Sequence, residues 1–207
     1  MNEYFSVFIF FFAVIDPIGT IPVFMTATQH FDEKMKQKIA LQAIGVSALI
    51  LLFFVIAGEY ILFWIGIPLS AFQIAGGIVL FLFALTMVFG VSKPEEEIKM
   101  SLSSAETAVF PLAIPSIASP GAMLAAVLLT ENNRFGIMEQ LQTAGIMLLV
   151  LLIVLVLLLM ATHMHRFIGI SGASIISRIM GLILSSLAVA NILEGITVYF
   201  ALPSLSF

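Results

Sequence analysis

The segment Phe10–Phe24, FFFAVIDPIGTIPVF, decides the fold, because Asp16, Pro17 and Pro22 stand in the middle of a long hydrophobic run. Proline has no backbone N–H and its ring displaces the carbonyl one turn earlier, so a pair of prolines interrupts a helix. Inside a bilayer, irregular backbone is tolerated only where it lies against protein or water. We therefore expect a broken membrane-spanning helix that faces the interior of a helix bundle.

The same pattern occurs a second time at Val109–Met123, VFPLAIPSIASPGAM. When Pro17 is aligned with Pro115, Pro22 falls on Pro120. These four prolines are the predicted helix breaks. Two broken spans in matching halves of a chain are typical of secondary transporters, which bind their substrates where such helices meet.

The composition predicts an all-α integral membrane protein. The chain is 61% hydrophobic and 10% charged, with a mean hydropathy of +1.19, whereas about a quarter of the residues of a soluble domain are charged. At about 20 residues per span, the 207 residues have room for six transmembrane helices. The hydrophobic runs place these at residues 4–27, 38–58, 69–90, 107–130, 141–162 and 174–199.

Several classes of partner and chemistry are disfavoured by the same composition. The chain has no cysteine, which excludes disulfides, thiolate metal sites and a cysteine nucleophile. The net charge of −4 gives no argument for nucleic-acid binding. Lys and Arg are absent ahead of the first apolar run, so we expect no cleaved signal peptide.

The distribution of basic residues predicts the orientation. The loops after the first, third and fifth spans share one side and hold seven of the eight Lys and Arg residues: Lys34, Lys36, Lys38, Lys93, Lys99, Arg166 and Arg178. Only Arg134 lies on the opposite side. Because Lys and Arg accumulate in cytoplasmic loops, both termini are expected on the extracytoplasmic side of the cell (inner) membrane.

The repeat extends beyond the broken spans. Leu41–Gly45 resembles Leu141–Gly145, and Gly77 aligns with Gly181, with offsets of 98 to 104 residues throughout. The sequence thus divides into a three-helix repeat at 1–91, a cytoplasmic linker at 92–106 and a second repeat at 107–207. Because each repeat has an odd number of spans, the second enters the membrane from the opposite side, and the repeats are inverted.

Asp16 is the one ionisable residue near the centre of a predicted span, where a charge costs about 2.5–3.5 kcal/mol. In one interpretation the carboxylate only caps the half-helix that begins at Pro17. In the other it also binds a cation, which would be a substrate ammonium, H⁺ or Na⁺. The sequence leaves both interpretations open.

The second break repeats the capping pattern without a charge, since Ser119 precedes Pro120. A zwitterionic amino acid needs an anion for its ammonium and N–H donors for its carboxylate, and the N-terminus of a half-helix supplies the donors. The predicted substrate-binding residues are therefore Asp16, Gly19, Thr20, Ser116, Ser119, Gly121 and Asn191. For the hydroxyls the alternative is a bond to a carbonyl one turn back, and for the glycines it is close helix packing.

Other polar residues of the third and sixth spans have a structural interpretation of comparable weight. Gln73, Thr86, Asn191 and Glu194 either line the cavity or bond helices together, and we favour packing for Gln73. Gly77 and Gly181 are predicted close-packing positions. His163 and His165 make a poor metal site by themselves, so no metal and no cofactor are predicted.

Six spans with DPIGTIP at Asp16–Pro22 and PSIASPG at Pro115–Gly121 resemble the MarC family, and the resemblance covers essentially the whole chain. The family is grouped with small neutral amino acid transporters and is distantly similar to amino acid exporters. The resemblance implies transport of a small metabolite. It leaves direction, coupling ion and oligomeric state open, a homo-oligomer included.

The expected function is therefore a secondary transporter of small neutral amino acids or similar small metabolites that works by alternating access. Export is among its expected directions. The alternatives are a cation- or metabolite-conducting channel and a membrane scaffold or stress-response protein. An enzyme is not expected, because the sequence has one buried Asp, no Cys and no His-Glu-x-x-His motif.

Overall fold

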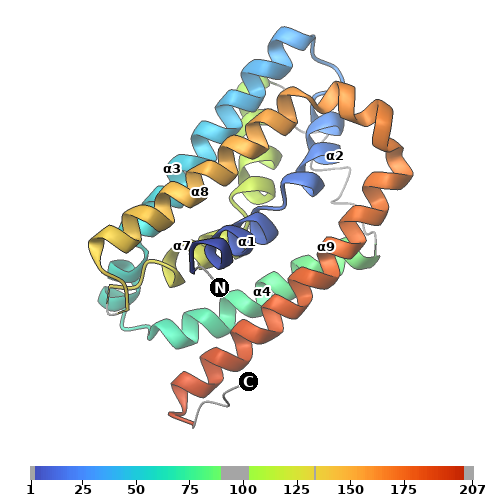
Figure 1. Ribbon diagram of the computed structural model, residues 1–207. Coiled ribbons are helices and arrows are strands. Elements are labelled where there is room, and N and C mark those ends of the chain that lie inside the picture. Colours follow the sequence, from blue (N-terminus) through green and yellow to red (C-terminus); the bar gives the residue numbers. More distant parts are fainter. Residues whose placement is uncertain (1–2, 90–102, 133, 203–207) are drawn as a thin grey trace.

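The computed structural model describes residues 3–89, 103–132 and 134–202, and every regular element in this part of the chain is a helix (Figure 1). Five helices are long and apolar enough to cross a membrane, or up to six when a bent pair is counted as one span. Most of the predicted linker, with Lys93 and Lys99, lies outside the described residues. The division into two domains at this linker stays a prediction.

The first span is broken at Asp16 into α1 (Glu3–Ile15) and α2 (Pro17–Ala27). Asp16 takes the left-handed conformation, with φ 49°, in which a short polar side chain is tolerated. This ends α1, and Pro17 then starts α2 with a φ that already suits a helix. Pro22 was also predicted as a break, and this was wrong, because α2 continues through it.

The fourth span is broken more gradually. The short helix α6 (Ser104–Thr107) continues into the π-helical segment η1 (Ala108–Ile117), whose backbone is extended at Phe110 and Ile114. The helix α7 (Pro120–Leu128) then begins at Pro120. The two parts of this span are bent by 59°. The extended residues directly precede Pro111 and Pro115, as expected from the clash between a proline ring and a preceding helical residue.

Four long helices complete the fold: α3 (Glu33–Ile65), α4 (Leu69–Phe89), α8 (Ile137–Leu159) and α9 (Ala161–Tyr199). The helix α3 is longer at both ends than the predicted span 38–58. It begins at the cap Asp32, whose carboxylate accepts the N–H of Met35, and it ends at Gly66, with φ 76°.

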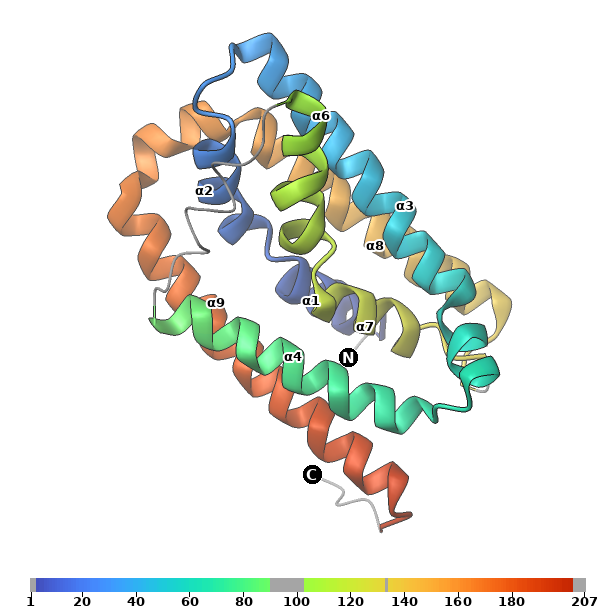
Figure 2. The ribbon, with the colours of Figure 1, turned by 180° about the vertical axis from the view of Figure 1, so that it is seen from behind.

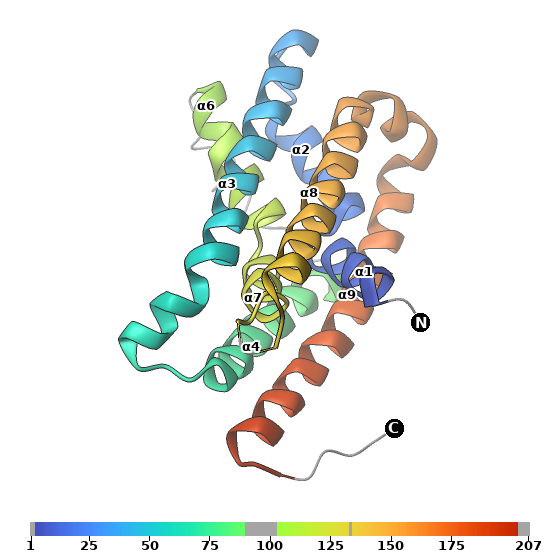
Figure 3. The same cartoon turned by 60° about the vertical axis from the view of Figure 1, so that its left-hand side comes forward.

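The helices form two outer layers with the broken spans between them. The helices α3 and α8 pack together, and so do α4 and α9, while direct contact between α3 and α4 or between α8 and α9 is slight. The layers are joined mainly through α1, α2, η1 and α7 (Figures 1 and 2). Figure 3 shows α1 beside α7, with α3 next to α7 and α9 next to α1. In the broken span Tyr4–Ala27, half of the most apolar 18-residue stretch is buried, against 22% of the corresponding stretch of α4. The broken span is therefore the more central of the two.

The α4–α9 contact is built on small residues spaced seven apart. On α4 these are Ser70, Gly77 and Ala84, and on α9 they are Gly181, Ala188 and Gly195. A Cβ added to Gly181 would lie 2.9 Å from the Ala84 carbonyl oxygen, and one added to Gly195 would lie 3.0 Å from that of Ser70. Small residues let helix backbones approach closely in a membrane.

The same contact has the arrangement expected of a repeated sequence. Gly77 lies against Ala188, and Gly181 lies against Ala84. The offset that aligns Gly77 with Gly181 also aligns Ala84 with Ala188, so exchanging the two repeats turns one contact into the other. Likewise, α2 packs on α9 and α7 packs on α4. The inverted repeat and the side on which the termini lie stay predictions.

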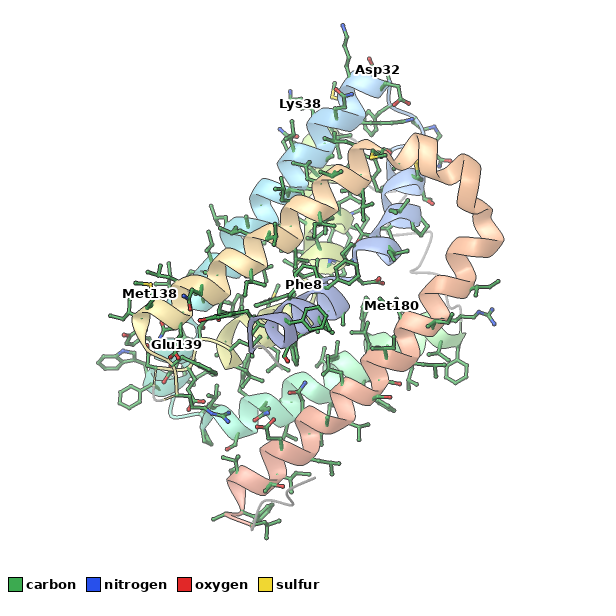
Figure 4. The ribbon with its side chains drawn as sticks, viewed as in Figure 1. Phe8, Asp32, Lys38, Met138, Glu139 and Met180 are labelled. Carbon is green, nitrogen blue, oxygen red and sulfur yellow. The ribbon has the colours of Figure 1, made fainter. Side chains whose placement is uncertain are left out.

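The orientation is testable at the two ends of the α3–α8 layer, where Lys38 and Met138 lie far apart (Figure 4). Because the chain lacks cysteine, single Lys38→Cys and Met138→Cys variants each carry one thiol. A membrane-impermeant maleimide should label Met138→Cys in intact cells and Lys38→Cys only after permeabilisation. Both residues are exposed, so the reverse pattern would invert the topology.

The close α4–α9 contact predicts a large difference between two glycines. Gly77→Leu should lower the free energy of unfolding by about 1–3 kcal/mol, because its side chain must displace Ile192 or the α9 backbone. Gly145→Leu, on an open face of α8, should leave stability nearly unchanged, because nothing lies within 4 Å of its added Cβ. Thermal unfolding in detergent measures both, and equal melting temperatures would contradict the packing.

Candidate functional site

Asp16 is 5% exposed, and it serves both halves of the first span. Its N–H donates to the Phe12 carbonyl oxygen, which completes the last turn of α1. Its carboxylate accepts the Gly19 N–H at 3.0 Å, which caps the first turn of α2. The N-terminus of α2 adds a partial positive charge beside this side chain. The predicted cap is therefore present, and the cation-binding role stays a prediction.

The two breaks are in direct contact. The Ser119 hydroxyl donates to the Val14 carbonyl oxygen at 2.8 Å, across 105 positions of sequence. That carbonyl lies in the last turn of α1, next to the break. The same Ser119 oxygen accepts the Ala122 N–H at 3.1 Å and so caps α7. One fully buried hydroxyl thus joins the end of α1 to the start of α7.

The glycines beside the breaks are needed for space. A Cβ on Gly19 would overlap the Asp16 carboxylate, and a Cβ on Gly121 would overlap the side chain of Leu80 on α4. Within the first turn of α7, Ser119 accepts the N–H groups of Ala122 and Met123. Pro120 has none, so Gly121 carries the remaining first-turn donor. The Ala122 N–H is therefore already engaged by Ser119.

The two other predicted hydroxyls are buried in the broken spans. Thr20 is 1% exposed, and its hydroxyl donates to the Asp16 carbonyl oxygen at 3.0 Å, which is the one-turn-back bond that was the alternative to a ligand contact. Ser116 is 6% exposed and lies in η1. Their role as substrate contacts stays a prediction.

Asn191 lies on the side of α9 that faces α4. It stands between Ala188 and Gly195, which both contact α4, and it is 5% exposed. Its side-chain nitrogen has no hydrogen-bond partner within the described residues. Three residues further along α9, the Glu194 carboxylate accepts a hydrogen bond from the Gln73 side chain of α4 at 3.2 Å. Gln73 therefore bonds α4 to α9, as the packing interpretation predicted.

A second polar cluster lies where the α7–α8 loop meets α3 and α9. The backbone and side-chain nitrogens of Asn132 donate to one Glu59 oxygen, at 2.7 and 2.8 Å. Arg134 lies 3.7 Å from Glu194 and 3.9 Å from Glu131. Burial raises the pKa of the Glu131 carboxyl, Arg134 lowers it, and the Glu59 and Glu194 carboxylates raise it further.

Comparisons with known proteins fit this architecture. A family model described as MarC family integral membrane protein matches residues 1–200. The chain belongs to this family. No solved structure matches it.

Relatives of this MarC-family chain cover nearly its whole length. A UPF0056 membrane protein of Buchnera aphidicola is 32% identical over 97% of the chain and 99% of the relative. A UPF0056 membrane protein of Methanocaldococcus jannaschii is 37% identical over 89% of the chain and 91% of the relative. The UPF0056 inner membrane protein YhgN of Escherichia coli is 32% identical over 96% of the chain and 98% of the relative. These names give a membrane location and no activity.

Sequence reasoning missed two features of this MarC-family chain. The bond from Ser119 to the Val14 carbonyl joins residues that no local pattern relates. The cluster of Glu59, Glu131 and Arg134 was also missed, although Arg134 had one available signal. It is the single basic residue that the orientation rule leaves on the extracytoplasmic side.

The double role of Ser119 predicts that Ser119→Ala lowers the free energy of unfolding by about 1–3 kcal/mol, because it removes a cap and leaves a buried carbonyl unpaired. Ser186→Ala is the matched control, since Ser186 is exposed and only bonds back to the Leu182 carbonyl. Thermal unfolding of both variants tests this. A shift at Ser119 no larger than that at Ser186 would contradict the role of the contact.

Proposed function

We propose that the chain is a secondary carrier of small neutral amino acids that works by alternating access. The observation that supports this most is the direct contact of two helix breaks, Ser119 with Val14, between two layers that otherwise touch little. Broken helices that meet in the middle of a bundle are the usual location of a transporter's substrate site. Layers joined mainly through this centre are free to rock against each other.

The proposed substrate contacts follow from the charges at the two breaks. The Asp16 carboxylate is the anion for the substrate ammonium, and the Gly121 N–H at the start of α7 is a donor for the substrate carboxylate. A zwitterion matches this pair of an anion and a donor. It is expected to be small, because Asp16 and Leu80 fill the space beside Gly19 and Gly121. Thr20, Ser116 and Asn191 are the further proposed polar contacts.

The proposed location is the cytoplasmic (inner) membrane, with both termini outside. The excess of Lys and Arg on one side and the name of the Escherichia coli relative support it. Candidate coupling ions are H⁺ and Na⁺, which would compete for Asp16.

Asp16→Asn tests the proposed role of the charge. Asparagine also tolerates the left-handed conformation and its amide oxygen accepts an N–H, so folding should be retained. Amino acid exchange in proteoliposomes should fall at least about tenfold, because a hydrogen bond to a charged group contributes about 1.5–3 kcal/mol. The control is Asp32→Asn, which changes the exposed Asp cap of α3 and should exchange normally.

Exchange of labelled for unlabelled substrate also separates the alternatives, since it requires a carrier and not a channel. The substrates to load are those amino acids that raise the melting temperature of the purified protein, because a ligand that binds only the native state stabilises it. A well-folded Asp16→Asn protein with unaltered exchange would remove Asp16 from the site. No exchange and no stabilisation by any small metabolite would refute the carrier proposal.

A further inference from the structure

The α7–α8 loop, described at residues 129–132 and 134–136, is held to α3 at one end and reaches α9 with the other. Asn132 binds Glu59 of α3 through two hydrogen bonds, and the Thr130 hydroxyl lies 3.5 Å from the Val55 carbonyl oxygen of the same helix. Gln140 of α8 donates to the Asn132 side-chain oxygen at 3.1 Å. The loop therefore belongs to the α3–α8 layer.

Arg134 of this loop contacts the other layer. Its guanidinium lies 3.7 Å from Glu194 of α9, and Glu194 is in turn held by Gln73 of α4. This ion pair connects the two layers at the end of the molecule where α3 ends and α4 begins. Below it lies the contact of Leu124 on α7 with Gly76 on α4, and further in lies the contact of Gly121 with Leu80. The ion pair thus lies above these contacts, at the end of the molecule toward which α7 runs from the break.

Arg134 is shared with a carboxylate of its own loop. Glu131 lies 3.9 Å from Nε of the guanidinium while Glu194 lies 3.7 Å from its Nη1, so Arg134 contacts both carboxylates at once. Because Glu131 belongs to the same loop, its contact keeps Arg134 within the α3–α8 layer. The side chain of Glu131 is 18% exposed, whereas that of Arg134 is 61% exposed. The two glutamates therefore share one cation.

We propose that the Arg134–Glu194 ion pair is the extracytoplasmic gate between the two helix layers and that Glu131 is the proton-binding residue that competes with it. The proposal rests on the carrier function above. When Glu131 binds a proton it loses its charge, Arg134 turns to Glu194, and the gate closes. When Glu131 releases the proton it holds Arg134 within its own layer, and the gate opens.

The surroundings of Glu131 make this protonation accessible. The charged groups that act on it are Arg134 of its own loop, Glu59 of α3 and Glu194 of α9. Burial and the two carboxylates raise its pKa above the ordinary value, against the effect of Arg134. Lowering the pH through the range of this raised pKa should close the gate.

A buried thiol below the gate reports its state. Leu124→Cys puts one thiol at a position that is 1% exposed in a chain without other cysteines. Its labelling rate with a membrane-impermeant maleimide is measured in intact cells expressing the full chain, with and without gate variants. Glu194→Gln should raise the rate about two- to fivefold, the range expected for an exposed ion pair. Glu131→Gln should lower it, because Arg134 then has one charged partner.

The matched control is Glu33→Gln, which removes an exposed ion pair of 2.9 Å within α3, with Lys36, at the opposite end of that helix. It should leave the labelling rate unchanged. In the Leu124→Cys protein without gate changes, added salt should speed labelling by screening the ion pair. Low pH should slow it by more than it slows labelling of the exposed Met138→Cys thiol, which measures the loss of thiolate alone. Glu194→Gln should abolish the salt effect, and Glu131→Gln should abolish this additional pH effect.

Equal labelling in all variants, with no response to salt and no pH response beyond that of the Met138→Cys thiol, would overturn the gate proposal even if the gate variants fold poorly, because the last two measurements need no gate variant. The labelling needs no substrate, so it is independent of the carrier proposal. Normal amino acid exchange with unresponsive labelling refutes the gate alone. Responsive labelling without exchange of any substrate supports the gate and refutes the carrier.

Discussion

The rest of the structure depends on one constraint, which is that backbone groups freed by a helix break inside lipid must find partners within the protein. At the first break, Asp16 supplies them through its left-handed backbone and its carboxylate. At the second break, Ser119 caps its own half-helix by accepting the Ala122 N–H. Its hydroxyl also donates to the Val14 carbonyl oxygen beside the first break. The first break therefore depends on the second for one of its carbonyl partners, and this bond holds both spans together at the centre of the bundle.

Two helix pairs that differ in side-chain size cover these central spans. The α4–α9 pair is close, because glycine, alanine and serine line it at intervals of one heptad. The α3–α8 pair carries large apolar side chains such as Leu51 and Leu151 in the buried positions. Since the pairs contact each other little directly, each can act as one body, and the polar residues of the α7–α8 loop lie where the bodies meet.

The features that could be predicted from the sequence are those with local causes. Proline chemistry located the breaks near Pro17 and Pro120, and the residues ahead of them identified the caps Asp16 and Ser119. Close packing at Gly77 and Gly181 followed from residue size. The family was also correctly identified, from motifs that span both halves.

What could not be predicted depends on tertiary context. Pro22 lies inside α2 although a proline past the first turn removes one backbone hydrogen bond, so the packing of α2 outweighs this local cost. The extension of α3 to Ile65 includes Glu59, a charge that the hydropathy pattern excluded from the span and that Asn132 binds in the fold. Asn191 was assigned to the substrate, and only the three-dimensional arrangement placed it on the α4 face of α9.

The overlap between Gly19 and Asp16 has a consequence for how this chain can vary. The space that a methyl group at position 19 would need is occupied by the carboxylate at position 16. A larger residue at 19 becomes acceptable only after the side chain at 16 has been shortened or turned away, and turning it away exposes the start of α2. The two positions are therefore epistatic: a larger residue at 19 requires an earlier change at 16, whereas Asp16 can change while Gly19 is kept.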